Sequence, residues 1–289
     1  MAPRASCHRL PCGKPGILLT SPASDTLIAV RSPHQEWPPQ TDGVALKAVL
    51  EGQREFWVED RRYVLGPGRY LLLPPGPRQE SGRTSERVAM LPIWFSKATA
   101  RSVAETLGAA SDEPTLLPRS PVLDVAVRRL WRFALRAESE GLPPDRTPEL
   151  ESLLLETLAS AWRASRRGAR RLERLSSVRA ATRLEIVRRL SLAEDLLRGR
   201  FRSPLSLSDL AGASGLSPYH FLRRFTEFYG TTPHRFLTRL RLSYARRLLS
   251  RGTRSVKEVA YACGYRSVPS FVHLCAREWG VNPSAIGGR

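Results

Sequence analysis

Residues 206–233 read SLSDLAGASGLSPYHFLRRFTEFYGTTP, and residues 255–283 read SVKEVAYACGYRSVPSFVHLCAREWGVNP. The second stretch repeats the pattern of the first, with one residue inserted after the central glycine. Matching positions lie 49 residues apart before the insertion and 50 residues apart after it. The pairs include Ser206 with Ser255, Ala211 with Ala260, Gly215 with Gly264, Phe221 with Phe271, Gly230 with Gly280 and Pro233 with Pro283. The C-terminal third of the chain therefore contains one small structural unit twice.

Each copy has the signals of a short helix, a turn and a second helix. A serine with a carboxylate three residues later forms a capping box at the start of the first helix. A glycine ends that helix, a serine followed closely by proline starts the next one, and another glycine ends it. This order is typical of a helix-turn-helix. We predict two such units, at about residues 206–230 and 255–280.

The second helix of each unit has an apolar side, which predicts a small core, and a polar outer side. The N-terminal half of such a helix can enter the major groove of DNA and reach base edges. A linking helix from Thr232 to about Ser250 is long enough to place the two units in successive major grooves. Base reading is predicted for Tyr219, Leu222 and Arg223 in the first unit and for Val272 and His273 in the second. Phosphate contacts are predicted for Ser217, His220, Arg224, Arg266, Ser267, Ser270 and Arg277.

The two reading helices differ in chemistry. Arg223 can bond the O6 and N7 atoms of guanine. In the second unit Pro269 and Val272 offer only apolar contact, and a neutral His273 accepts or donates a single hydrogen bond. We therefore expect the first unit to carry most of the base specificity and the second unit to contribute mainly affinity.

The composition is strongly basic, with a net charge of +19 and a pI of about 11.0. Such a charge favours an anionic partner, either nucleic acid or an acidic membrane surface. Nearly all of it is arginine, which a composition bias would also produce. The sequence has no apolar run of the ~18 residues that a membrane-spanning helix needs, no signal peptide, and only four cysteines. We expect a cytoplasmic protein with reduced thiols and no membrane partner.

Residues 184–286 resemble the DNA-binding domain of the AraC/XylS family of bacterial transcription regulators. The resemblance implies seven helices that form two helix-turn-helix units on a linking helix, with a cupin-like sensor ahead of them. Two departures are His273, where the family usually has arginine, and Cys275, where it usually has phenylalanine. The residues that carry the resemblance include Leu210-Ala211, Gly215-Leu216-Ser217, Arg223 with Phe225, Thr232-Pro233, Arg241 with Ala245, Val259-Ala260, Gly264-Tyr265 and Gly280 with Pro283.

The N-terminal part divides into four segments. Residues 1–24 are rich in Pro, Ser, Gly and Cys, and we predict a flexible arm. Residues 25–118 contain short apolar runs between turn residues, which predict an antiparallel sandwich or small barrel. Their middle, from Leu50 to Gly76, resembles the hairpins of a cupin-like sensor barrel. Apolar stripes in residues 119–165 predict helices that form either core or a dimer seam, and residues 166–183 read as a basic, solvated linker. The predicted fold class is α+β, with an all-α domain at residues 184–289.

The barrel segment lacks the ligands of a metalloenzyme. A metal-binding cupin needs two or three histidines and a carboxylate, and this segment holds only His34. The arm offers Cys7, His8 and Cys12, which lack a fourth ligand. We predict no metal, no cofactor and no catalytic residue. The aromatic side chains could line an effector pocket or could simply pack; the candidates are Trp37, Phe56, Trp57, Tyr70 and Trp94.

Together these features predict a sequence-specific transcription regulator, and not an enzyme. Its partners would be operator DNA, a small-molecule effector, a second copy of the chain and, for an activator, RNA polymerase. Three alternatives stay open. They are a cupin-type metalloenzyme fused to a DNA-binding module, a DNA-repair methyltransferase with such a module, and a non-specific architectural DNA binder.

Overall fold

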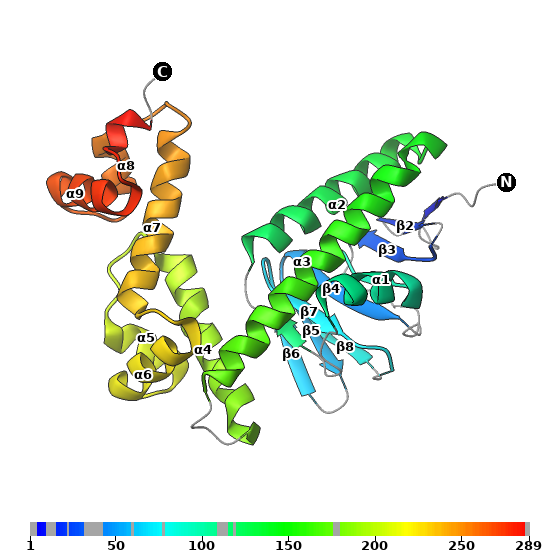
Figure 1. Ribbon diagram of the computed structural model, residues 1–289, viewed down its shortest axis with the longest axis horizontal. Helices are drawn as coiled ribbons and strands as arrows, with labels where there is room; N and C mark the ends of the chain where they lie inside the picture. The colour runs from blue at the N-terminus through cyan, green and yellow to red at the C-terminus, as the bar shows by residue number, and fades with distance from the viewer. Residues whose placement is uncertain are drawn as a thin grey trace. The chain divides into compact units, whose positions relative to one another are not determined.

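The computed structural model describes residues 5–9, 16–21, 23–31, 43–58, 61–76, 79–108, 115–117, 120–175 and 180–286 (Figure 1). The chain forms two compact units, Met1–Ala169 and Arg170–Arg289. The first unit combines sheets with helices, and the described part of the second unit is helical. This arrangement confirms the predicted α+β class.

The described strands of the first unit form an eight-stranded sheet and a three-stranded sheet, and neighbouring strands are antiparallel. The larger sheet has the order β1-β2-β3-β10-β4-β7-β11, with β9 beside β3 and β4, and the smaller has the order β6-β5-β8. The strands are β1 (Ser6–Arg9), β2 (Gly16–Thr20), β3 (Thr26–Val30), β4 (Val44–Glu51), β5 (Arg54–Val58), β6 (Arg61–Leu65), β7 (Tyr70–Leu73), β8 (Gln79–Thr84), β9 (Ala89–Met90), β10 (Ile93–Phe95) and β11 (Thr115–Leu117).

The prediction of a flexible arm at residues 1–24 is wrong where the structure describes it. β1 and β2 pair with each other, and β2 pairs with β3 in the large sheet. Ile17 and Leu19 of β2 are fully buried, so the apolar run of this strand contributes to the core. Cys7 is partly buried, and Cys12 lies outside the described residues.

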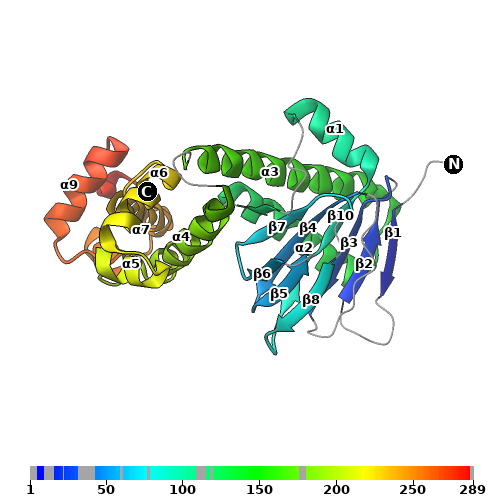
Figure 2. The ribbon, with the colours of Figure 1, turned by 90° about the horizontal axis from the view of Figure 1, so that it is seen from below.

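The two faces of the large sheet bury side chains in two different cores. In β4, Val44, Leu46 and Ala48 pack with the helices, whereas Ala45 and Val49 face the small sheet. Helices lie along the first face, as Figure 2 shows for α3. They are α1 (Lys97–Leu107), α2 (Pro121–Glu140) and α3 (Thr147–Glu173), with a 3-10 turn at Pro144–Arg146.

We predicted a solvated basic linker at residues 166–183, but α3 and α4 together cover most of this range. Arginine is a good helix former, so a run of arginines does not by itself end a helix. Two of these arginines are bonded within the first unit. Arg166 donates to the carbonyl of Leu107, and Arg167 Nη2 donates to Ser120 Oγ at 3.0 Å.

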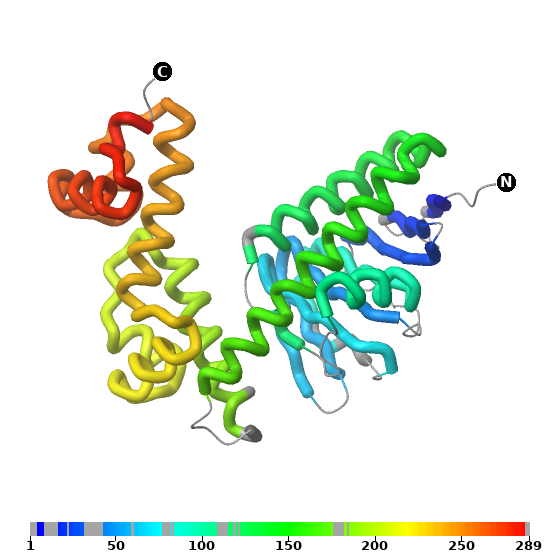
Figure 3. Tube along the Cα trace, in the orientation of Figure 1, coloured from blue at the N-terminus to red at the C-terminus, as the bar shows by residue number. Residues whose placement is uncertain are grey.

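The second unit contains both predicted helix-turn-helix units, and α7 runs from one to the other (Figure 3). The second unit starts earlier than residue 184, because the fully buried Leu175 belongs to the core of its first helix-turn-helix. Each helix-turn-helix has its own small core, and α7 contributes Leu237 to the first and Leu242 to the second. The helices are α4 (Ala180–Arg200), α5 (Leu207–Ser214), α6 (Pro218–Tyr229), α7 (Pro233–Leu249), α8 (Val256–Ala262) and α9 (Val268–Trp279), followed by a 3-10 turn at Pro283–Ala285.

The two turns share their backbone geometry but not their surroundings. Gly215 and Gly264 both have left-handed φ angles, 62° and 82°. In both turns the residue after the glycine donates its N–H to the alanine five residues before it, at 3.1 and 3.0 Å. A Cβ on Gly264 would lie 2.3 Å from the carbonyl oxygen of Arg202, whereas the nearest atom to a Cβ on Gly215 would be Arg189 Nη1 at 3.7 Å. Gly280, which ends α9, also has a left-handed φ, 72°, but a Cβ there would meet nothing within 4 Å.

This difference predicts unequal costs for alanine at two left-handed glycines. Gly280→Ala should lower the free energy of unfolding by about 1–2 kcal/mol, the cost of a left-handed alanine. Gly264→Ala should cost about 2–5 kcal/mol, because the backbone of Arg202 must also move. Urea denaturation of the full chain, followed by far-UV circular dichroism, measures both. Equal losses would show that the close approach at Gly264 does not constrain the turn.

Candidate nucleic-acid interface and the interior of the first unit

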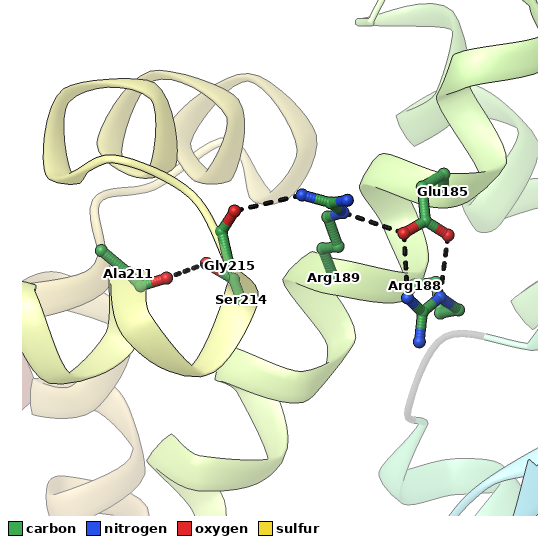
Figure 4. A network of polar contacts seen from close by, with 6 residues as sticks. All are labelled: Glu185, Arg188, Arg189, Ala211, Ser214 and Gly215. Atoms are coloured by element: carbon green, nitrogen blue, oxygen red, sulfur yellow. Dashed lines mark hydrogen bonds and ion pairs between the residues drawn. The ribbon is translucent and has the colours of Figure 1, made fainter.

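The turn of the first helix-turn-helix is held by a side chain from α4. Figure 4 shows Arg189 between two acceptors: its Nη1 donates to the carbonyl of Gly215 at 3.1 Å, and its Nε donates to Glu185 Oε1 at 2.8 Å. Within α5, Ser214 Oγ donates to the carbonyl of Ala211 at 2.9 Å. Hydrogen bonds from α4 and within α5 therefore stabilise the turn that leads into the first reading helix, α6.

The second turn is tied to the first helix-turn-helix through Arg241 of α7. Arg241 Nε donates to the carbonyl of Phe201 at 2.7 Å, and its Nη2 donates to the carbonyl of Ser203 at 3.1 Å. The same guanidinium lies 5.4 Å from the ring centroid of Tyr265, which follows the turn glycine. One side chain thus joins the loop after α4, the linking helix and the second turn.

The outer side of α6 presents the residues predicted to read bases. Tyr219 is 70% exposed and Leu222 is 38% exposed, while Phe221 and Phe225 on the opposite side are fully buried. Ser217 caps the helix, because its Oγ accepts the N–H of His220 at 3.4 Å. The predicted division of α6 into a core side and an outer side is confirmed.

Arg223 and Arg224 share one carboxylate, Glu227. Arg223 Nε donates to Oε1 at 3.0 Å, and Arg224 Nη1 donates to Oε2 at 2.8 Å. Burial of Glu227 opposes its charge, but the bonds from the two arginines outweigh burial and lower the pKa of the carboxyl. The side chain of Arg223 is 50% exposed and that of Arg224 only 19%. Glu227 accepts a hydrogen bond from Nε of Arg223 and thereby orients the guanidinium. This bond does not involve the two terminal nitrogens, Nη1 and Nη2.

The second reading helix, α9, presents less polar chemistry. Ser267 caps it and accepts the N–H of Ser270 at 3.3 Å. His273 is exposed, and Val272 is half-buried because it also packs on the core of its own unit. Arg266, the extra residue of the second turn, is exposed.

The N-termini of α6 and α9 both carry predicted phosphate contacts. The unpaired backbone N–H groups of a helix N-terminus and the helix dipole attract anions. Ser217 with His220, and Ser267 with Ser270, sit in the first turn of these two helices. Arg224 follows on α6, whereas Arg277 near the end of α9 pairs with Glu278 at 3.3 Å.

A cleft of about 810 Å³ lies between the start of α5, the linking helix and α9. Its charged lining is mostly basic, and the opposing carboxylates are those of Asp209 and Glu278. We did not predict this cleft, because it brings together three segments that are far apart in the sequence. The basic side chains that line it are His234, Arg235, Arg239, Arg241 and Arg277.

The structure separates the aromatic residues that we predicted as effector contacts. Phe56 and Trp94 are buried together between the two sheets of the first unit. Tyr70 lies in the other core, where its hydroxyl donates to Asp124 Oδ1 at 2.7 Å. Trp57 is 40% exposed. Trp37, like His34, lies outside the described residues.

Two cations are buried in the same interior as Phe56 and Trp94, and we did not predict either. Lys47 on β4 is 1% exposed, and its Nζ lies 4.3 Å from the ring centroid of Trp94. Arg54 on β5 is 4% exposed and lies 6.0 Å from the ring centroid of Phe56. Burial, and then the charge of Arg54, lower the pKa of Lys47 to about 7. The sequence signal was Lys47 itself, which interrupts the apolar strand VALKAVLE at a position that alternation places inside.

The buried cysteines of the second unit are core residues. Cys263 and Cys275 are fully buried, and burial raises the pKa of their thiols to about 11 and about 12. A thiol with such a pKa is a poor nucleophile at neutral pH. Cys275 is therefore a small core residue of the second helix-turn-helix.

Within the described ranges, His, Cys, Asp and Glu side chains form no group of three or more that could hold a metal ion. In the same ranges, no helix has the length and apolar character needed to cross a membrane.

Two family models match separate parts of the chain. Residues 26–161 match an AraC-like ligand binding domain, and residues 210–289 match a helix-turn-helix domain. The first match covers most of the described sheets and helices of the first unit, and the second covers both reading helices.

Similar full-length proteins include bacterial regulators. The chain is 27% identical over 231 residues to the "Uncharacterized HTH-type transcriptional regulator YbfI" of Bacillus subtilis (strain 168), which covers 75% of this chain and 74% of that protein. It is 34% identical over 116 residues to the HTH-type transcriptional activator RhaS of Enterobacter sp. (strain 638), but this match spans only 36% of this chain and 42% of RhaS. A solved AraC-type regulator from Chromobacterium violaceum is 30% identical, with 34% of this chain and 88% of that chain covered and a TM-score of 0.33.

The lowered pKa of Lys47 predicts how stability changes with pH. The unfolded chain keeps this proton up to about pH 10.5, the ordinary value, whereas the folded chain loses it above about pH 7. The free energy of unfolding should therefore rise with pH between these values. We expect the difference between the wild type and Lys47→Met to show this rise in urea denaturation from pH 6.5 to pH 10. A flat difference for Lys47→Met would contradict its buried charge.

Proposed function

Because the chain belongs to the AraC/XylS family of transcription regulators, we propose that it reads two successive major grooves of an operator under the control of a small molecule bound by its first unit. The observation that carries this proposal is the pair of capped reading helices, α6 and α9, joined by α7 and tied together through Arg241. The match of residues 26–161 to a ligand-binding domain supports the control by an effector.

The dimensions of α7 support reading of successive grooves. Its 17 residues span about 26 Å at 1.5 Å per residue. With the width of the two units added, this length is compatible with one helical turn of DNA, about 34 Å. The hydrogen bonds from Arg241 to the loop after α4 support a constant spacing between the two units.

Base specificity is proposed to come mainly from α6. Arg223 presents terminal nitrogens for a guanine while Glu227 holds its Nε. Tyr219 and Leu222 contribute stacking and apolar contact. On α9, Val272 is half-buried because it packs against the core of its own unit, and His273 is exposed. His273 is therefore the main candidate for a polar contact with a base on this helix.

The basic cleft is proposed to follow the DNA backbone between the two grooves. Arg235 and Arg239 of α7 are exposed in it, and Arg277 enters it from α9. Such contacts carry no base information, but each neutralised phosphate releases counterions and adds salt-dependent affinity. Asp209 and Glu278 limit the positive charge at its two sides.

The first unit is proposed to be a cupin-like sensor that also dimerises the protein. Its two sheets share one apolar interior, as the halves of a flattened barrel do. Val122 and Val125 on α2 and Leu155 on α3 are 60%, 56% and 43% exposed. Exposed apolar side chains on neighbouring helices support a dimer seam. RNA polymerase is the further partner that an activator would contact, and the similarity to the activator RhaS supports this choice.

Substitutions of the two neighbouring arginines should separate base reading from phosphate contact. An operator is first selected from random DNA by the wild-type protein, and affinities are then measured for all single base changes. Arg223→Ala should relax preference at one base pair, at a cost of about 1–3 kcal/mol. Arg224→Ala should weaken every sequence alike and reduce the salt dependence by about one counterion. An equal loss across all sequences for Arg223→Ala would remove its base-reading role.

Changes in operator spacing test the two-groove geometry. Footprinting of the selected operator should show two protected major-groove segments one helical turn apart. An insertion of about 5 base pairs between them turns the second segment to the opposite face, and about 10 restore the face but lengthen the span by one turn. Both insertions should reduce affinity to that of a single unit. Full affinity on either would mean that α7 does not set the spacing, and protection without any preferred site would favour an architectural DNA binder.

A further inference from the structure

We propose that Lys47 binds the carboxylate of the small molecule that controls this protein, in the apolar interior between the two sheets of the first unit. This inference rests on the proposed function, because it presumes an effector. It adds the chemical class of the ligand, a monocarboxylate with an apolar body, and the residue that recognises it.

The placement of Lys47 follows from the register of the sheet. β4 lies between β10 and β7 in the large sheet, and Lys47 is paired with Leu71 of β7. Leu71 points into the interior between the sheets, as do Ala45 and Val49 on either side of Lys47. Side chains that are paired across neighbouring strands share a face. The lysine stem is therefore directed into the protein, and the large sheet and the helices behind it separate it from solvent on the other side.

In the described part of the chain, the ammonium of Lys47 has no partner of opposite charge. Among the described residues, its Nζ makes no hydrogen bond. The face of Trp94, 4.3 Å away, attracts a cation, but such contacts offset only part of the cost of burying one. Arg54 is the nearby charged group, and it carries the same sign. Buried charges in proteins are normally paired, so the ammonium of Lys47 is electrostatically incomplete within the described residues.

A purely structural role does not account for Lys47. Methionine has a similar length, packs in an apolar interior and carries no charge. At this position it would avoid the desolvation of an ammonium, so the lysine lowers the stability of the folded protein. A group that destabilises the fold is typical of a site built for binding.

The surroundings define the ligand. A carboxylate beside Lys47 would form a charge-assisted hydrogen bond in a medium from which water is excluded. It would also relieve the repulsion between Lys47 and Arg54. Phe56, Leu65 and Trp94 are among the apolar residues buried in this interior, and they suit an aliphatic or aromatic body. Because Lys47 belongs to the large sheet and Arg54 to the small one, one carboxylate would connect the two sheets.

The test measures thermal unfolding of the full chain at pH 6.5 without DNA. The probes are straight-chain and aryl monocarboxylates of graded length, each beside its amide, together with phenyl phosphate. We expect at least one acid at millimolar concentration to raise Tm by a few degrees and its amide to have no effect. Lys47→Met should abolish this shift and should raise Tm in the absence of ligand. Lys97→Met, which removes an exposed lysine of the same unit, should keep the shift.

Calorimetry on the wild type gives a second measurement that needs no variant. The titratable groups of this interior in the described chain are Lys47, Arg54 on β5 and, at its edge, Tyr63 on β6. Binding of an acid requires protonated Lys47, whose pKa is about 7. The affinity should therefore fall about 25-fold between pH 6.5 and pH 8.5.

Several outcomes would overturn the inference. They are equal shifts from acids and amides, a shift from the phosphate ester alone, a shift that persists in Lys47→Met, an affinity that does not change with pH, and no shift from any acid. Operator binding separates this failure from failure of the proposed function. If Lys47→Met and the wild type bind the selected operator equally but no acid stabilises the protein, only the inference about Lys47 fails. If the wild type selects no operator, the proposed function fails instead.

Discussion

The guanidinium of Arg241 is the contact on which the DNA-binding unit depends. It donates to two carbonyls in the loop after α4 and lies over the ring of Tyr265 in the second turn. Each helix-turn-helix has its own small core, and α7 is the helix that contributes side chains to both. Cores of this size do not by themselves fix the position of one helix-turn-helix relative to the other. The close approach of Gly264 to the backbone of Arg202 acts at the same place. Together these contacts turn two small cores into one compact unit with a set distance between its reading helices.

The duplication preserves the scaffold and changes what it presents. Both copies keep the capping box, the left-handed turn glycine and the glycine that ends the reading helix. The surroundings differ, since a side chain from α4 bonds to the first turn, whereas the second turn approaches the backbone of Arg202 closely. The outer sides differ as well: a carboxylate positions the exposed Arg223 on α6, whereas α9 offers His273 beside a half-buried valine. This asymmetry underlies the proposal that one copy specifies sequence while the other adds affinity.

The first unit buries two charged side chains, Lys47 and Arg54, in its apolar interior. Strand β4 of the large sheet is buried on both faces, between helices on one side and the small sheet on the other. In such a strand a charged residue has no route to water, so Lys47 must end in the interior, where Arg54 of the small sheet is buried as well. A stable core would exclude both. Both lie in the part of the chain that matches a ligand-binding domain.

The sequence by itself determined the local structure, namely both helix-turn-helix units, their caps, their reading sides and most strands between residues 25 and 95. These features depend on capping residues, glycines and apolar periodicity, which are all local properties of the sequence. It did not reveal β1, β2 or the polar β8, which are strands because partner strands hold them. It also could not show that Tyr70 faces the helices while Trp94 faces Lys47. Only the tertiary structure decided those placements, the basic cleft and the Arg241 contacts. All of these features join segments that are distant in the chain, and they depend on which face of a strand or helix is covered.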